Sequence, residues 1–196
     1  MPMVPTEFAG LIVSNFAASG INGTGSVPLA NAIANGIVTY LTSSPLVQTV
    51  DVGTAGAGSG LGIGVTGVVP TAVTGAIVGN LAAVNIIGTA VTPMITAVCN
   101  ALSDTLSLAT VTTVNTGVGV GTGVGFLIGI NPGALASQMI GLAPGFGLNG
   151  TAVTPMFTGI ANGIADTLNG TAIVNVVIAG PPSPSPSGGT GIGFLS

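Results

Sequence analysis

The feature that most limits the folds open to this chain is an internal repeat, because similar segments should adopt similar structures. Prolines occur in pairs 23 residues apart at three places, Pro5 and Pro28, Pro70 and Pro93, and Pro132 and Pro155. The hexapeptide GTAVTP occurs at 88–93 and again at 150–155. Such a period indicates tandem copies of one supersecondary unit. We therefore predict three repeats of about 62–65 residues, at 1–68, 69–130 and 131–196.

Each repeat reads as two helices followed by two strands. A proline begins the first helix, where its missing N–H costs nothing. The second helices are predicted at 28–41, 93–106 and 155–168. Runs rich in β-branched residues then predict strands at 46–52, 109–116 and 171–179. The predicted fold class is α+β, with three tandem repeats.

A glycine-rich segment ends each repeat, at 58–64, 121–127 and 189–195. Glycine alternates there with larger residues, and a period of two is typical of an extended strand. One face of such a strand carries only glycine, so another backbone can approach it closely. The third repeat also contains a Pro/Ser insertion at 181–189, which we interpret as an exposed loop or extended arm.

Helix ends are marked by specific residues. Thr92 and Thr154 stand before the second prolines and are predicted to cap their helices, with proline in the first helical position. Pro144 should end the first helix of the third repeat early.

Every predicted helix carries two small residues four positions apart, and residues at this spacing share one helix face. We expect each pair to form a notch where a neighbouring helix packs closely. The pairs are Gly10/Ser14, Gly75/Gly79, Ser137/Gly141, Ala32/Gly36, Ala97/Ala101 and Gly159/Gly163.

Composition excludes several functions. The chain has no Lys, Arg or His, only four acids, and one cysteine. Nucleic-acid binding through phosphate neutralisation, zinc sites and histidine-activated nucleophiles are therefore excluded. We predict that the protein is not an enzyme and has no catalytic, cofactor-binding or metal-binding residues. Cys99 lies in an apolar helical pattern and is expected to be buried.

The few polar residues at equivalent positions leave two interpretations open. Asp104 and Asp166 are either solvated acids near helix ends or part of a carboxylate ring that binds a hard cation. The first repeat has Thr39 at this position, which favours the solvated acids. Asn35, Asn100 and Asn162 are candidates for a buried polar layer that specifies register.

The longest apolar stretch, 60–91, is the best candidate for a membrane-spanning segment. Gly64, Gly67 and Pro70 interrupt it, and no basic residue flanks it. The N-terminal sequence lacks the positive region of a secretory signal, so we expect assembly without export, in the cytoplasm of the cell that makes the chain.

A chain with so few charges should cover much of its surface with other protein. Its composition and the repeated endings GSGLGIG, GTGVGFL and GTGIGFL resemble the small glycine-, alanine- and threonine-rich structural proteins of tailed bacteriophage virions. The resemblance implies a structural virion component, such as a capsid decoration, a neck or tail ring, or a baseplate part. Its expected partners are copies of itself or other proteins of the same particle.

The alternative is a membrane-active glycine-zipper protein, acting as a pore, a conduit or a hydrophobic coat. Either function predicts that the glycine strands and helix notches are buried within the chain or between chains. On this hypothesis Gly123→Val blocks assembly more than it unfolds an isolated repeat.

Overall fold

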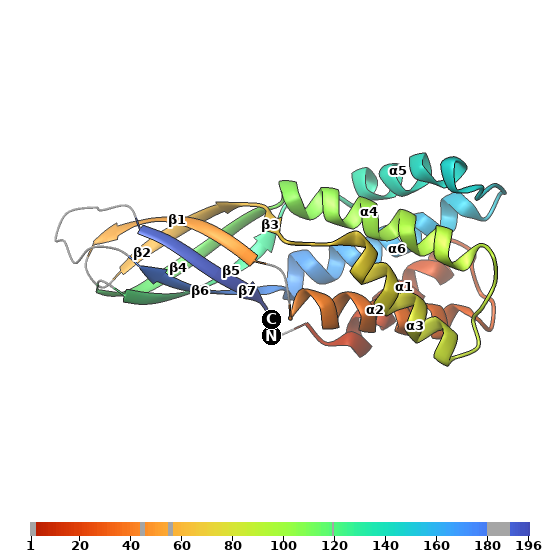
Figure 1. The fold of residues 1–196 in the computed structure, drawn as a ribbon, viewed down its shortest axis with the longest axis horizontal. Coiled ribbons are helices and arrows are strands. Elements are labelled where there is room, and N and C mark those ends of the chain that lie inside the picture. Colours follow the sequence, from red (N-terminus) through yellow and green to blue (C-terminus); the bar gives the residue numbers. More distant parts are fainter. Residues whose placement is uncertain (1–2, 44–45, 55–56, 119, 180–188) are drawn as a thin grey trace.

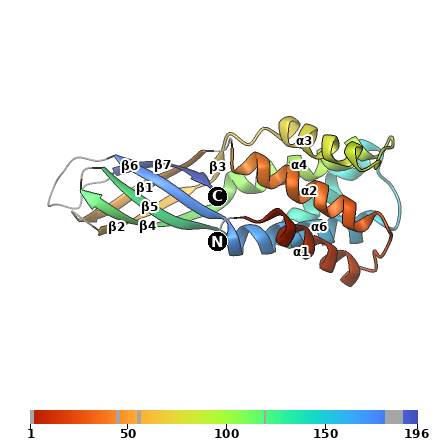
Figure 2. The ribbon, with the colours of Figure 1, turned by 90° about the horizontal axis from the view of Figure 1, so that it is seen from below.

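The computed structural model describes residues 3–43, 46–54, 57–118, 120–179 and 189–196. Helices and an antiparallel sheet occupy opposite ends of an elongated molecule (Figure 1). The predicted α+β class is confirmed. The chain termini lie side by side at the junction between the two ends (Figure 2).

Six α-helices and one short 3-10 helix lie in the described part of the chain. They are α1 (Pro5–Ala18), α2 (Ser26–Leu41), α3 (Pro70–Ala83), α4 (Val91–Leu108), α5 (Pro132–Leu142), η1 (Ala143–Phe146) and α6 (Val153–Thr171).

The strands follow each second helix and lie close to their predicted positions. They are β1 (Leu46–Thr54), β2 (Ala57–Ile63), β3 (Val65–Thr66), β4 (Thr110–Val118), β5 (Val120–Ile128), β6 (Ile173–Ala179) and β7 (Gly189–Leu195). The Pro/Ser insertion at 181–189 lies outside the described residues, except for Gly189, which begins β7.

Proline begins the first helix of each pair, as predicted, at Pro5, Pro70 and Pro132. The residue before each of these prolines has an extended backbone and therefore lies outside the helix. Asn131 also caps α5, where its side chain accepts a hydrogen bond of 3.0 Å from the Ala134 backbone N–H. The α5 helix ends at Leu142, and Pro144 lies in the tighter turn of η1 that follows.

The predicted threonine caps are wrong. Helices α4 and α6 begin at Val91 and Val153, one residue before Thr92 and Thr154. Both threonines therefore lie inside the first turn, and their carbonyl groups accept hydrogen bonds from Thr96 and Thr158. Proline is tolerated further into this turn than expected, because backbone N–H groups there have no partner within the helix.

Strand pairing runs in a circle. The order β2-β4-β5-β6-β7-β1 is joined end to end by pairing of β1 with β2, so six strands each have two antiparallel neighbours. The short β3 strand pairs with the start of β1. A sheet closed in this way has no long unpaired edge.

In the bundle, each first helix packs against two second helices: α1 against α6 and α2, α3 against α2 and α4, and α5 against α6 and α4. Small residues of the second helices receive side chains from the first helices. Ile77 of α3 lies over Gly36 of α2, and Ile12 of α1 lies over Gly163 of α6. These notches are the close contacts that the small-residue spacing predicts.

The notches on the first helices are different. Gly10, Gly75, Gly79 and Gly141 are exposed, with open space where a side chain would stand. They lie on the outside of the bundle, so they are not buried within the chain, and their burial between chains stays a prediction. Only one face of α1, α3 and α5 is needed to pack on the second helices.

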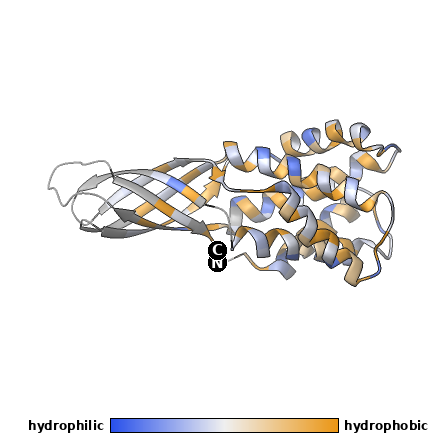
Figure 3. Ribbon diagram, in the orientation of Figure 1, coloured by the Kyte–Doolittle hydropathy of each residue, from blue (hydrophilic) through white to orange (hydrophobic). Residues whose placement is uncertain are grey.

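One apolar core runs from the bundle into the base of the sheet. Figure 3 shows apolar residues in both parts of the molecule. Five fully buried side chains fill the sheet where it meets the helices: Val47, Val111, Leu127, Val174 and Leu195.

Candidate functional site

The glycines of the ladder strands point into the closed sheet. Gly60, Gly62, Gly123, Gly125 and Gly193 are buried. A Cβ atom on Gly125 would collide with the Thr112 carbonyl oxygen and approach the Thr113 Cα to 2.7 Å. The predicted close approach of backbone to glycine is therefore found inside the chain.

This orientation changes the expectation for Gly123. The residue faces the interior of the sheet and is not available to a neighbouring subunit. Gly123 is buried on the same side of β5 as Gly125, so we expect Gly123→Val to disturb sheet closure itself, in contrast to the expectation from the sequence.

Large side chains stand at the alternate positions and point outward. We call seven of them the outer apolar face, and their exposed fractions run from 40% at Ile128 to 72% at Val114. They belong to five of the six strands that form the closed sheet. The outer apolar face consists of Leu61, Val114, Val124, Phe126, Ile128, Val177 and Ile192.

Strand register brings these side chains together. Val114 lies directly opposite Val124, and Val177 lies opposite Ile192. Between these pairs stand uncharged polar residues, such as Thr112 opposite Phe126. Among the outward side chains of the sheet that the structure describes, none is charged. The sheet therefore presents apolar and uncharged surface around most of its circumference.

The acids at equivalent positions do not form a site. Asp104 and Asp166 are exposed, and Asp166 accepts a hydrogen bond of 3.4 Å from the Asn15 amide. Within the described ranges, no three His, Cys, Asp or Glu side chains lie close enough to hold a metal ion. The arrangement fits the solvated acids better than the carboxylate ring.

The proposed asparagine layer is wrong. Asn35 is exposed, while Asn100 and Asn162 are half-buried. Apolar residues such as Ile33, Leu102 and Ile164 occupy most of the positions that face inward along these helices, because a packed helix places apolar residues at its buried positions.

Cys99 is fully buried on α4, as expected. Burial raises the pKa of its thiol from 9.0 to about 11, and the neighbouring Thr74 side chain lowers it by a smaller amount. A thiol in this state is neutral at physiological pH and has little reactivity.

Sequence reasoning missed the outer apolar face. It treated the glycine positions of the ladder strands as the contact surface and gave no role to the residues between them. The signal was present in the same alternation, because a strand with glycine on one side places Leu61, Val124 and Phe126 together on the other.

Comparisons with protein-family models, curated proteins and solved structures found no match. None of the helices in the described residues combines the length and apolar character needed to span a membrane.

Proposed function

We propose that this protein is a non-enzymatic structural subunit of a large symmetric assembly, and that this assembly is a virion. The observation that carries the proposal is the outer apolar face, which surrounds a closed sheet and leaves large side chains 40% to 72% exposed. Subunit contacts through this face would hold the particle together.

Surface energetics support this role. Each square ångström of apolar surface left in water costs about 25 cal/mol relative to burial. Monomeric proteins rarely expose contiguous apolar patches above a few hundred square ångströms. Here side chains such as Phe126 and Val177 stay 50% and 60% exposed, with no described charge on the sheet between them. Burial against neighbouring subunits removes this cost.

We also propose that the three segments 1–68, 69–130 and 131–196 are structural repeats, so that one chain supplies a pseudo-threefold unit. The contacts between helices support this. Ile12 and Ile77 occupy the same position after Pro5 and Pro70, and each lies over a glycine at the same position in a second helix. A threefold unit fits a position of threefold or sixfold symmetry, as in a ring or a shell.

The first test is the oligomeric state of the purified chain at micromolar concentration, measured by analytical ultracentrifugation without detergent. We expect a large, defined oligomer. The double variant Val114→Ser and Val177→Ser should shift the chain toward smaller species while its circular dichroism stays unchanged. Val84→Ser is the matched control, because Val84 is 49% exposed but lies after α3, away from the sheet. A stable monomer of the unmodified chain contradicts the proposal.

The second test separates a virion component from the membrane-active alternative. Particles purified without detergent should contain the chain at a fixed ratio to the other structural proteins, measured by quantitative mass spectrometry. Partition of the chain into lipid vesicles or detergent, with none in the particles, would favour the alternative instead. The open glycine notches on α1, α3 and α5 are the structural feature that favours the membrane-active alternative.

A further inference from the structure

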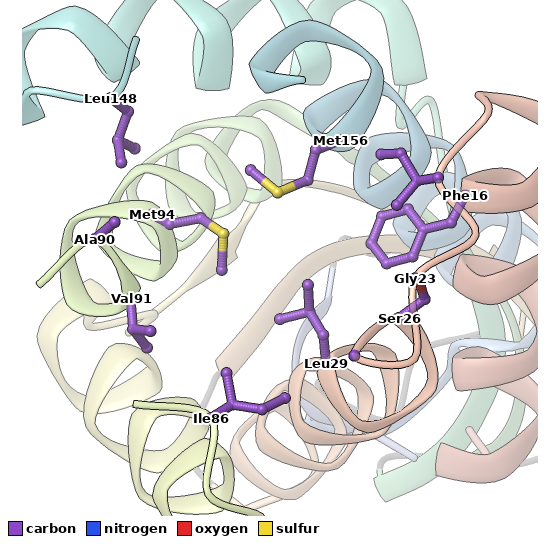
Figure 4. A pocket seen from close by; sticks show the side chains of 12 residues that line it. Phe16, Gly23, Ser26, Leu29, Ile86, Ala90, Val91, Met94, Leu148 and Met156 are labelled. Carbon is purple, nitrogen blue, oxygen red and sulfur yellow. The ribbon is translucent and has the colours of Figure 1, made fainter. Parts of the chain in front are cut away.

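A pocket opens at the end of the bundle that lies away from the sheet. Its volume is about 470 Å³. Figure 4 shows side chains from three parts of the chain pointing into it, among them Leu29, Met94 and Met156. Phe16 forms part of the wall and is fully buried, whereas Leu29 and Met156 are half-buried. The pocket therefore has a rigid wall and a more accessible lining.

The lining comes from corresponding places in the three segments. Leu29, Met94 and Met156 each directly follow the second proline of their segment. Ile21, Ile86 and Leu148 also line the pocket, and each stands two residues before a glycine of the loop between helices. An apolar side chain from every segment thus reaches the same space. The pocket is therefore formed by the fold as a whole and not by poor packing at one residue.

The chemistry of the lining restricts what the pocket can hold. Apart from the backbone, the only polar group in it is the Ser26 hydroxyl. The chain contains no Lys, Arg or His to pair with an anion, and no acid lines the pocket to pair with a cation. Burying an unpaired charge is costly, so the pocket selects an uncharged ligand.

Size restricts the ligand further. An apolar cavity of about 150 Å³ holds one benzene ring, and known small-molecule sites run from about 300 to 1,000 Å³. This pocket is about three times the benzene cavity, so it has room for a ligand of about three aromatic rings. The two methionines adapt to such a ligand, because their unbranched side chains change shape easily.

We propose that this pocket is a binding site for one uncharged, hydrocarbon-like small molecule of about three-ring size. The site does not depend on the assembly proposed above, because it lies on the bundle and belongs to a single chain.

Titration with N-phenyl-1-naphthylamine, a neutral three-ring probe whose fluorescence rises in apolar surroundings, tests the proposal. We expect saturable binding of one probe per chain. Leu29→Trp fills the pocket and should weaken binding at least tenfold. Met156→Gln keeps the side-chain length but adds polarity, and it should weaken binding in a protein that still folds even if the tryptophan variant does not. Circular dichroism checks that each variant is folded.

Val177→Ser is the matched control, because it removes apolar surface from the sheet and leaves the pocket intact. Its probe affinity should equal that of the unmodified chain. Binding that falls in this control but persists in Met156→Gln would place the probe on the outer apolar face and overturn the proposal. Absence of saturable binding would also overturn it, as expected if the pocket receives only a side chain of a partner protein.

Discussion

Ile12 of α1 lies directly over Gly163 of α6, so that a Cβ atom on the glycine would come within 2.5 Å of the Ile12 Cγ1 and 3.0 Å of its Cα. The neighbour is partly backbone, which cannot turn aside as a flexible side chain does. Ile77 lies over Gly36 in the same way. In each of these two helix pairs, the helices can therefore come this close only because one residue of the second helix is a glycine.

Gly163→Ala should lower the free energy of unfolding by about 1–3 kcal/mol, because the added methyl group forces α1 away from α6. Gly75→Ala is the matched control. Gly75 lies inside α3 with nothing within 4 Å of a Cβ atom, so this change should raise stability by about 0.5–1 kcal/mol through the unfolded state. Urea unfolding of both variants measures the difference. Equal effects would show that the contact does not limit helix spacing.

Gly125→Ala should be more damaging than the helix substitution. The new methyl group meets the Thr112 carbonyl oxygen and the Thr113 backbone inside the closed sheet, where neither strand can move without losing its pairing. We expect a loss of at least about 3 kcal/mol. Thermal unfolding measures this loss, with Ser59→Ala on the outward side of β2 as control. A fully stable Gly125→Ala protein would contradict the inward orientation of the glycines.

Thr113→Val should stabilise the protein. The Thr113 side chain is 3% exposed, and its hydroxyl has no hydrogen-bond partner among the described residues. A buried unpartnered hydroxyl costs about 1–3 kcal/mol. Valine has the same shape without the hydroxyl, and Val176 occupies the corresponding position of β6. The melting temperature should rise by about 2–4 °C for each kcal/mol gained. A lower melting temperature would show that the hydroxyl is bonded.

Alkaline pH should destabilise the protein through Cys99. Because burial holds the pKa of this thiol at about 11 in the folded chain, against 9.0 ordinarily, the unfolded chain releases its proton first as the pH rises. The stabilising contribution is complete below pH 9 and is lost by pH 11. Two pH units at about 1.4 kcal/mol each correspond to about 3 kcal/mol.

Urea unfolding at several pH values from 8 to 11 measures this loss, and Cys99→Ala is the control. Alanine is tolerated there, because Ala34 and Ala161 occupy the corresponding buried positions of the other two segments. The variant should lose the Cys99 contribution to the pH dependence. If both proteins weaken equally with pH, another group is responsible.

Much of the local structure follows from the sequence, because its signals are local. Proline at the start of α1, α3 and α5 and the alternation in the ladder strands each act within a few residues. The direction in which the glycines face is different. Alternation separates two faces but does not say which lies inside. Closure decides it, since the inner side of a narrow sheet has too little room for side chains such as Val124.

The contacts between distant segments could not be predicted from the sequence. Pairing of β1 with β7 joins residues far apart in the sequence, such as Val47 and Gly193, and no local pattern encodes it. The apolar pocket also depends on how three loops converge. Its residues Leu29, Met94 and Met156 were visible only as apolar positions at helix starts.

Circular strand pairing also has a consequence for synthesis on the ribosome. Because β1 is paired on one side by β7, which is translated after β6, the sheet stays open until Gly189–Leu195 has emerged from the ribosome. Until then β1 and β6 both present free backbone groups to other nascent chains, and closing so long a loop is slow. Chains released before Gly189 would therefore keep unsatisfied edges, which favour aggregation.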